Sequence, residues 1–375
     1  MILFISHYAG RTGAPIALLH LVRWLSLNTD LRFDILLRRG GELFDDFNEV
    51  APTYVCNHTP KHRIFKSKSA SICLDRLPRE IHGRKYQLIY SNTVANGSLV
   101  SGLFNEDIPL ITHCHEMDYW MNKLQHDEMP FTITRTSEFI ACSNPSAKCL
   151  VKRGVKQNDI QVIPGPFDSS SSVSKANNNL RDELGIPNDS FVVLAGGAEP
   201  WRKGKDLFVQ LAALLQSSDN QRYDLIWLGD PNDTEFEYWL AASAEYANAS
   251  RIIHWPGLVS NPQDYFQISN VFCMLSREDP MPLIAIEAGA FGLPVVCFVS
   301  AGGTADWVAE SGGGRVASYL DVGSVANSIR SYAADRDACL ADGSLAKSYC
   351  TTQFSLNRIG PMVLNVINKY NLDTY

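Results

Sequence analysis

The chain has 375 residues, so two domains of roughly 150 to 200 residues each are expected. With 45% hydrophobic and 19% charged residues it can bury substantial cores, which excludes a generally disordered protein. No apolar run reaches the roughly 18 residues of a membrane helix, and the net charge of −7 argues against a nucleic-acid-binding protein.

The N-terminus and the cysteines indicate a reducing compartment. Residues 1–6 have no basic leader and no small-residue cleavage site, and they are interpreted as a buried strand rather than a signal peptide. Nine cysteines form no C-x-x-C pair, which disfavours both a disulfide framework and a zinc site. Cys273 and Cys297 lie inside apolar runs, as core cysteines do.

Short apolar runs alternate with helical patterns along the whole chain. The first series of predicted strands is Leu3–Ser6, Phe33–Leu37, Leu88–Ser91, Leu110–Thr112, Phe139–Ala141 and Gln161–Ile163. The second series is Val192–Gly196, Leu225–Gly229, Ile252–Trp255, Val271–Leu275, Val295–Val299 and Arg315–Ala317. Predicted helices include Ala14–Ser26, Asp206–Leu215, Leu283–Phe291 and Asn357–Tyr370. This alternation is typical of parallel sheets that helices cover on both faces.

A Pro/Gly/Ser-rich stretch separates the two series. It begins at Pro164-Gly165-Pro166 and continues through Ser169–Ser172, as expected of a linker. We therefore predict an α/β protein of two doubly wound Rossmann-like domains, residues 1–165 and 183–354, joined by a linker at 166–182. Ligands of such sheets bind beyond the carboxyl ends of the strands, so a cleft between the facing domains is the expected site.

Charge is distributed unevenly. Residues 1–165 contain 19 Lys and Arg against 16 Asp and Glu, and the remainder contains 14 against 24, so the first half is the one suited to an anionic partner. The main basic cluster contains Lys61, Arg63, Lys66, Lys68, Arg76, Arg79, Arg84 and Lys85. It is either a solvated loop or a patch that binds anionic lipid, with Ile64 and Phe65 inserted.

The segment from Ser276 to Ala288 carries the clearest chemical signal. An acidic loop follows a buried strand, and Pro282 is placed to open the next helix because its fixed φ suits a first helical position. Asp279 then lies at the N-terminus of the helix, near its free backbone N–H groups, and Glu287 follows on the helix itself. This acidic pair is suited to holding hydroxyls at two ends of one polar ligand. The alternative is that Asp279 caps the helix and Glu287 is solvated.

Several motifs together resemble the family-4 glycosyltransferases of the GT-B fold. The run D-P-M-P-L-I-A-I-E-A-G-A-F-G-L-P-V-V, residues 279–296, resembles the E-x7-E signature of that family. Gly302–Asp306 resembles the G-G-x-x-E loop of the family, and Gly196–Asp206 resembles its phosphate-binding stretch. Residues 226–229 and 253–259 fall where the family has the strands of its sugar-nucleotide pocket. In the first half the resemblance is thinner and rests on Gly13-Ala14, Thr112–Glu116 and Ala141–Ser143.

The resemblance implies a retaining, metal-independent glycosyltransferase with no cofactor. It would move a sugar from a UDP- or GDP-sugar donor to a hydroxyl of a saccharide or lipid-linked glycan, in cell-surface polysaccharide biosynthesis. It also implies that a helix within 355–375 packs back on the first domain. The expected location is cytoplasmic, either free or peripheral on the inner face of the membrane, with no nucleic-acid partner.

The resemblance also assigns roles to individual residues. Glu287 would bind the ribose hydroxyls of the donor, and Asp279, with backbone N–H groups near Met281 and Leu283, would hold the transferred sugar. Lys203 would neutralise the departing diphosphate. His115 would lie beside the reacting sugar, and Gly13 would border the diphosphate. The backbone near Leu258 would contact the base of the nucleotide.

Two positions depart from the family pattern. Asp279 replaces the first Glu of the signature, and Ala198 replaces the Arg that usually lies five residues before the Lys. Arg202 supplies the missing charge only if it points into the same site as Lys203. Each such charge contributes about 3–4 kcal/mol in a water-poor site, so its loss would slow the enzyme.

Other interpretations stay open at this stage. His113, His115 and Glu116 also fit a metal site, whereas the D-x-D at Asp335–Asp337 is interpreted as a solvated helix face. A nucleotide-sugar epimerase or hydrolase of the same fold is disfavoured by the D-x7-E run. A non-catalytic sugar-nucleotide or glycan binder stays open as an alternative because Ala198 replaces the usual Arg. A nicotinamide dehydrogenase is poorly supported because Gly10–Gly13 is no G-x-G-x-x-G motif.

Overall fold

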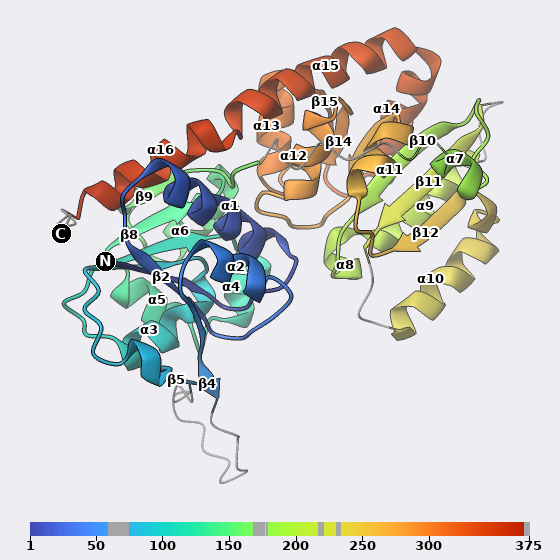
Figure 1. The fold of residues 1–375 in the computed structure, drawn as a ribbon. Coiled ribbons are helices and arrows are strands. Elements are labelled where there is room, and N and C mark those ends of the chain that lie inside the picture. Colours follow the sequence, from blue (N-terminus) through green and yellow to red (C-terminus); the bar gives the residue numbers. More distant parts are fainter. Residues whose placement is uncertain (59–74, 168–176, 178, 217–220, 230–233, 371–375) are drawn as a thin grey trace. The chain divides into compact units, whose positions relative to one another are not determined.

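The structure, a computed structural model, describes residues 1–58, 75–167, 177, 179–216, 221–229 and 234–370 (Figure 1). It divides into two compact units: unit 1 comprises Met1–Pro166 and Leu356–Tyr375, and unit 2 comprises Phe167–Ser355. Most of the predicted linker and the basic segment 61–68 lie outside the described residues. The end of the predicted linker, in contrast, is described and forms the start of a short helix at Leu180–Glu183.

Unit 1 is built on a seven-stranded parallel sheet in the order β3-β2-β1-β6-β7-β8-β9. Its strands are β1 Ile2–Ser6, β2 Phe33–Leu37, β3 Thr53–Val55, β6 Leu88–Ser91, β7 Leu110–Cys114, β8 Glu138–Ala141 and β9 Ile160–Val162, beside a small pair, β4 Asn57–His58 and β5 Asp75–Arg76. Its helices are α1 Gly13–Asn28, α2 Phe44–Val50, α3 Gly97–Leu103, α4 Asp118–Lys123, α5 Met129–Arg135, α6 Asn144–Lys152 and α16 Leu356–Asn368, with 3₁₀ turns η1 Arg79–Ile81, η2 Val94–Asn96 and η3 Gln157–Asp159.

Strand β1 shows why the central strands have continuous apolar sequences. Ile2 and Phe4 point into a core shared with α1, whereas Leu3 and Ile5 point into a second core on the opposite face. Because side chains alternate between the faces of a strand, a strand covered on both faces is apolar at every position.

Helix α16 belongs to unit 1 although it is the last helix of the chain. Ile359, Val363, Val366 and Ile367 are buried in the same core as α1 and β1. The chain therefore returns to the first unit after it has completed the second.

Unit 2 is built on a six-stranded parallel sheet in the order β12-β11-β10-β13-β14-β15. Its strands are β10 Phe191–Gly196, β11 Tyr223–Leu228, β12 Ile253–Gly257, β13 Val271–Met274, β14 Val295–Phe298 and β15 Gly314–Ala317. Its helices are α7 Leu180–Glu183, α8 Pro200–Lys203, α9 Lys205–Gln216, α10 Thr234–Tyr246, α11 Pro262–Ile268, α12 Leu283–Ala290, α13 Gly303–Ser311, α14 Val322–Ala334 and α15 Arg336–Gln353, with a 3₁₀ turn η5 Ser250–Ile252.

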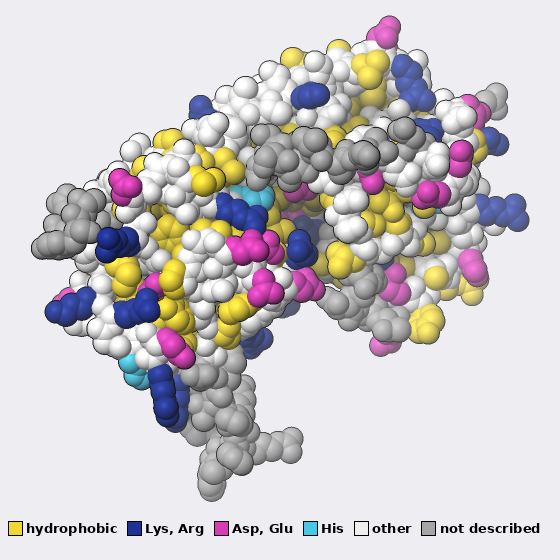
Figure 2. All heavy atoms as spheres, viewed as in Figure 1, with side chains coloured by type: hydrophobic (Ala, Val, Ile, Leu, Met, Phe, Trp, Pro, Cys, Tyr) yellow, Lys and Arg dark blue, Asp and Glu magenta, His cyan; other side chains and the backbone are white. Residues whose placement is uncertain are grey.

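The surface of the described residues carries charges of both signs. On the face in Figure 2, Lys and Arg side chains of unit 1 are interleaved with Asp and Glu rather than gathered in one area. No helix within the described part of the chain is both long enough and apolar enough to cross a bilayer.

Candidate active site

The strand order of unit 2 indicates where a ligand binds. Strand β10 lies between β11 and β13. The connection from the carboxyl end of β10 runs to β11, and the connection from the carboxyl end of β13 runs to β14, in the opposite direction along the sheet. A crevice forms at such a switch point, and ligands of open α/β sheets bind there. Lys203 follows β10 and Asp279 follows β13, so both predicted residues belong to this edge of the sheet.

Two adjacent cations converge on the carboxylate of Asp279. The Lys203 ammonium donates to Asp279 Oδ2, and the Arg202 guanidinium lies 3.8 Å from the same oxygen. Arg202 is fixed by Glu199, 2.5 Å from its Nε, and by a hydrogen bond of 2.7 Å to the carbonyl of Glu278. Burial lowers the pKa of Lys203, an effect that the charge of Asp279 opposes. Arg202 and Lys203 therefore point into one site. This was the condition under which Arg202 could supply the positive charge that is missing at Ala198.

The glycine before Ala198 makes room for the lysine side chain. A Cβ atom at Gly197 would lie 2.9 Å from both Cγ and Cδ of Lys203. The backbone of Gly197 is fixed in turn by its N–H, which donates to the carbonyl of Leu228 at 2.8 Å. The position that faces the lysine is thus Gly197, and any larger residue there would displace Lys203.

The second glycine-rich loop holds Asp279 in place. The Asp279 N–H donates to the carbonyl of Ala301 at 2.7 Å, and the Gly303 N–H donates to that of Pro280 at 2.9 Å. Gly302 lies so close that a Cβ atom there would be 1.6 Å from the carbonyl oxygen of Asp279. Only glycine fits at this contact, so the Gly302–Asp306 loop fixes the loop that carries Asp279.

One expectation about the start of α12 is wrong, and the alternative role of Asp279 as a helix cap is not found either. The helix begins at Leu283, and Pro282 is its N-cap with an extended ψ of 120° rather than its first helical residue. Nor does Asp279 cap the helix, since the N-cap is Pro282 and the carboxylate of Asp279 is paired with Lys203 instead. Within the described ranges, the first backbone N–H groups of α12, near Met281 and Leu283, therefore have no side-chain acceptor.

Substituting the glycine at this contact tests the arrangement through stability. We expect Gly302→Ala to lower the free energy of unfolding by about 1–3 kcal/mol or more, because the methyl group must displace the backbone of Asp279. Gly13→Ala is the matched control, since a Cβ at Gly13 meets no atom within 4 Å. Thermal unfolding checks both variants, and an unchanged midpoint for Gly302→Ala would contradict the close approach.

Glu287 lies on α12 as a partly buried carboxyl group. Its side chain makes no hydrogen bond or ion pair with any of the residues that the structure describes. Burial raises its pKa from 4.5 to about 7. The side chain of Leu258, after β12, is 70% exposed, so this position offers its backbone rather than a packed side chain.

In unit 1 the corresponding switch point lies between β1 and β6. The loop after β1 leads to Gly13, which is exposed at the start of α1, and Asn92 follows β6. Asn92 connects the two predicted residues of this unit: its Nδ2 donates to the carbonyl of Ala14 at 2.7 Å, and its Oδ1 lies 3.1 Å from Nε2 of His115. Sequence reasoning missed Asn92, although its place directly after a predicted strand is a usable signal.

Glu116 organises the backbone beside His115. Its carboxylate accepts hydrogen bonds from the hydroxyl of Thr93 and from the N–H groups of His115 and Val94, the latter two at 2.9 and 3.4 Å. With these partners the carboxylate of Glu116 holds the backbone in place. Among the described residues, no three His, Cys, Asp or Glu side chains are arranged to hold a metal ion, and that includes His113, His115 and Glu116.

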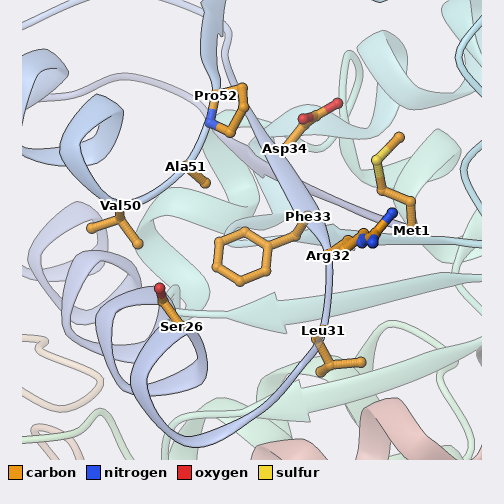
Figure 3. A pocket seen from close by; sticks show the side chains of 9 residues that line it. All are labelled: Met1, Ser26, Leu31, Arg32, Phe33, Asp34, Val50, Ala51 and Pro52. Carbon is orange, nitrogen blue, oxygen red and sulfur yellow. The ribbon is translucent and has the colours of Figure 1, made fainter. Parts of the chain in front are cut away.

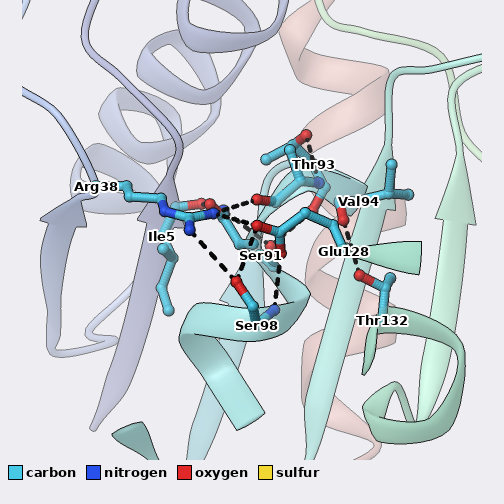
Figure 4. Close-up of polar contacts among 10 residues, drawn as sticks. Ile5, Arg38, Ser91, Thr93, Val94, Ser98, Glu128 and Thr132 are labelled. Atoms are coloured by element: carbon cyan, nitrogen blue, oxygen red, sulfur yellow. Dashed lines mark hydrogen bonds and ion pairs between the residues drawn. The ribbon is translucent and has the colours of Figure 1, made fainter. Parts of the chain in front are cut away.

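A partly buried ion pair supports the loop that carries Asn92. Arg38, at the end of β2, pairs with Glu128 at 2.8 Å and donates to the carbonyl of Ala95 at 2.6 Å. Glu128 accepts from the backbone N–H of Ser98 at 2.7 Å and from its hydroxyl at 2.9 Å, and Figure 4 shows these groups turned toward one another. The loop from β6 to α3 is thereby tied to the end of β2, which lies on the other side of β1 in the sheet.

Two hollows in unit 1 lie away from these residues. One of about 330 Å³ lies at the amino-terminal ends of β1 and β2, the opposite edge of the sheet from Asn92 (Figure 3). It is lined by Met1, Ser26, Leu31, Arg32, Phe33, Asp34, Val50, Ala51 and Pro52. None of these lining residues is a predicted site residue.

Two further predictions concern charged surface residues. Asp335 is the N-cap of α15, where its Oδ1 accepts from the N–H of Ala338 at 3.0 Å, and Asp337 is exposed in the first turn, so this D-x-D is a solvated helix start. Arg84, counted in the basic cluster, pairs instead with the buried Asp34 at 2.6 Å.

Comparison with known proteins gives matches over both units. The model of the group 1 glycosyl transferases matches residues 176–344, and that of glycosyltransferase family 4 matches residues 12–171. An alpha-monoglucosyldiacylglycerol synthase of Acholeplasma laidlawii is 32% identical over 37% of this chain and 35% of its own length. A D-inositol 3-phosphate glycosyltransferase of Xylanimonas cellulosilytica is 26% identical over 64% and 62%. The chain thus spans less than two thirds of these curated relatives.

Solved structures match the whole chain at low identity. HepE of Anabaena, solved in complex with UDP and glucose, aligns with a TM-score of 0.81 at 20% identity, covering 98% of this chain and 99% of that one. WaaG, a glycosyltransferase involved in lipopolysaccharide biosynthesis, aligns with a TM-score of 0.73 at 14% identity, covering 98% and 99%. These alignments identify the fold as GT-B, as predicted.

Proposed function

Since the chain belongs to the family-4 glycosyltransferases of the GT-B fold, we propose that it is a retaining transferase that takes a sugar from a nucleoside diphosphate sugar. The bond from the anomeric carbon to the diphosphate breaks, and a bond to an acceptor hydroxyl forms on the same face of the sugar. The acceptor proton leaves with the diphosphate. The acceptor we propose is a saccharide or lipid-linked glycan.

The observation that carries the proposal is the convergence of Arg202 and Lys203 on Asp279. Negative charge develops on the diphosphate as it leaves, and preorganised cations in a water-poor site stabilise it. In the structure, the two cations are held by carboxylates of this chain, Asp279 and Glu199. A bound diphosphate would share these cations, and Asp279 would accept a hydrogen bond from a sugar hydroxyl.

The other contacts follow the family assignment. The uncapped N-terminus of α12 offers backbone N–H groups to the sugar or phosphate. Glu287, without a partner among the described residues, is the acceptor for the ribose diol, and the open space around Gly13 admits a diphosphate close to the backbone. We propose UDP rather than GDP as the carrier because HepE was solved with UDP and glucose. Transfer itself requires no metal ion in this proposal.

Thermal unfolding with nucleotides tests the proposal. UDP, GDP, CMP and their common sugar conjugates are added separately, and ligand at 100 times its dissociation constant adds about 2.7 kcal/mol of stability. For a unit of this size that is a shift of several degrees. We expect UDP and UDP-sugars to raise the midpoint, whereas no shift with any of these ligands would overturn the proposal.

The pKa of Glu287 predicts how donor binding depends on pH. Ribose hydroxyls donate to the ionised carboxylate, so with a pKa of about 7 the affinity for a UDP-sugar should rise about tenfold from pH 6 to pH 8. The ligand-free protein should show the opposite trend: between pH 4.5 and about 7 the folded state binds the extra proton, so stability falls as pH rises. Calorimetric titration with a UDP-sugar, which lacks a terminal phosphate that titrates, measures the first effect. Glu287→Gln should bind without this pH dependence, and an equally steep profile in that variant would assign the effect elsewhere.

A further inference from the structure

Asn92 makes two contacts whose chemistry fixes the orientation of its amide. One end lies 2.7 Å from the carbonyl oxygen of Ala14, which can only accept a hydrogen bond, so the amide NH₂ must be there. The amide oxygen therefore faces Nε2 of His115, at 3.1 Å. Because that oxygen can only accept, the proton of the imidazole is on Nε2.

The imidazole of His115 is neutral in this environment. Burial, and then His113 and His7, hold the pKa of His115 well below its usual value. The ring of His113 packs on that of His115 at a centroid distance of 4.1 Å. Glu116 faces the backbone N–H of His115 with its carboxylate. A neutral ring with its proton on Nε2 has its lone pair on Nδ1, and Nδ1 makes no hydrogen bond within the described part of the chain.

We propose that Asn92 is a positioning residue that holds His115 in the Nε2-protonated tautomer, so that Nδ1 accepts a hydrogen bond from a hydroxyl of the transferred sugar. The inference rests on the proposed function, since the family resemblance places His115 beside that sugar. It adds the direction of the contact: His115 recognises an O–H donor and supplies neither a proton nor a positive charge. The same amide also holds the first turn of α1, so the loop of Gly13 and the ring of His115 are set by one side chain.

Nuclear magnetic resonance of the ring nitrogens tests the tautomer without any substrate. In protein labelled with ¹⁵N-histidine, the signals of His115 are assigned by their loss in His115→Gln. We expect a protonated Nε2 and an unprotonated Nδ1 in the wild type, and a population of the other tautomer in Asn92→Ala. The matched control is Asn96→Ala, which removes a buried asparagine of the same loop that bonds to Ser91 at 3.1 Å and not to His115. This control should leave the tautomer unchanged.

Kinetics of Asn92→Asp test the direction of the contact. The new carboxylate still accepts from Nε2–H, although it can no longer donate to the carbonyl of Ala14. An opposite charge at this distance raises the pKa of His115, and an imidazolium presents Nδ1 as a donor. The ratio of kcat/KM between variant and wild type should therefore fall as the pH is lowered from 8.5 to 6. Asn92→Ala, in which no charge is added, should show a lower kcat, and its kcat/KM relative to the wild type should not change with pH.

A proton on Nδ1 in the wild type, or an unchanged tautomer in Asn92→Ala, overturns the inference even if transfer is observed. The expected tautomers in a protein without transferase activity would instead count against the proposed function alone.

Discussion

Replacing Lys203 by Ala is expected to lower the rate of sugar transfer by about 100- to 1000-fold while the protein stays folded. The ammonium lies in a buried site, where one placed charge stabilises the departing diphosphate by about 3–4 kcal/mol. Asp279 does not become an isolated buried charge, because Arg202 remains 3.8 Å from it. The measurement is kcat with a UDP-sugar donor beside a thermal unfolding curve.

Lys205 provides a matched control for this substitution. It is a second buried lysine in the same segment, but its ammonium pairs with both oxygens of Glu237, at 2.8 and 2.9 Å, away from Asp279. Lys205→Ala should therefore lower stability and leave kcat near the wild-type value. Equal losses of activity in both variants would show that Lys203 acts through stability, and full activity of Lys203→Ala would remove it from the site.

Replacing Glu287 by Ala is expected to abolish the stabilisation by UDP, a loss of about 2.7 kcal/mol at 100 times the wild-type dissociation constant. The ligand-free variant should be no less stable than the wild type above pH 7, because the wild type there holds a buried carboxylate without a partner among the described residues. The two effects have opposite signs, so general unfolding cannot account for both. Thermal unfolding with and without UDP measures them.

The control for this second substitution is Glu310→Ala, on α13 of the same unit. Glu310 is exposed and bonds to the hydroxyl of Tyr349 at 2.8 Å. We expect it to change the UDP-dependent shift little. A full shift in Glu287→Ala would disprove the assignment of this carboxylate to the ribose.

The sheets could be predicted because their strands are buried on both faces. Such strands are continuous apolar runs, and the predicted strands of both series fall on strands of the structure. Strand β3, Thr53–Val55, was not predicted, because it is only three residues long and lies at the edge of the sheet. Its pairing with β2 is a tertiary contact that local pattern does not encode.

The site residues could be located by motif, but their directions could not. Adjacent residues on a helix normally point about 100° apart, yet the long side chains of Arg202 and Lys203 reach the same carboxylate from the short helix α8. Likewise Arg84 looks like part of a basic surface in the sequence, while its partner Asp34 lies fifty positions away. Such pairings depend on how the fold brings together segments that are distant in sequence.

The return of the chain to unit 1 at α16 has a consequence for the order of folding. During synthesis every strand and helix of unit 2 has left the ribosome once residue 355 has emerged, whereas the core of unit 1 still lacks Ile359, Val363 and Val366. Domains generally fold as units, N-terminal ones first. Here the unit that starts the chain can complete its core only after α16 has emerged, and until then α1 lacks the helix that packs against it.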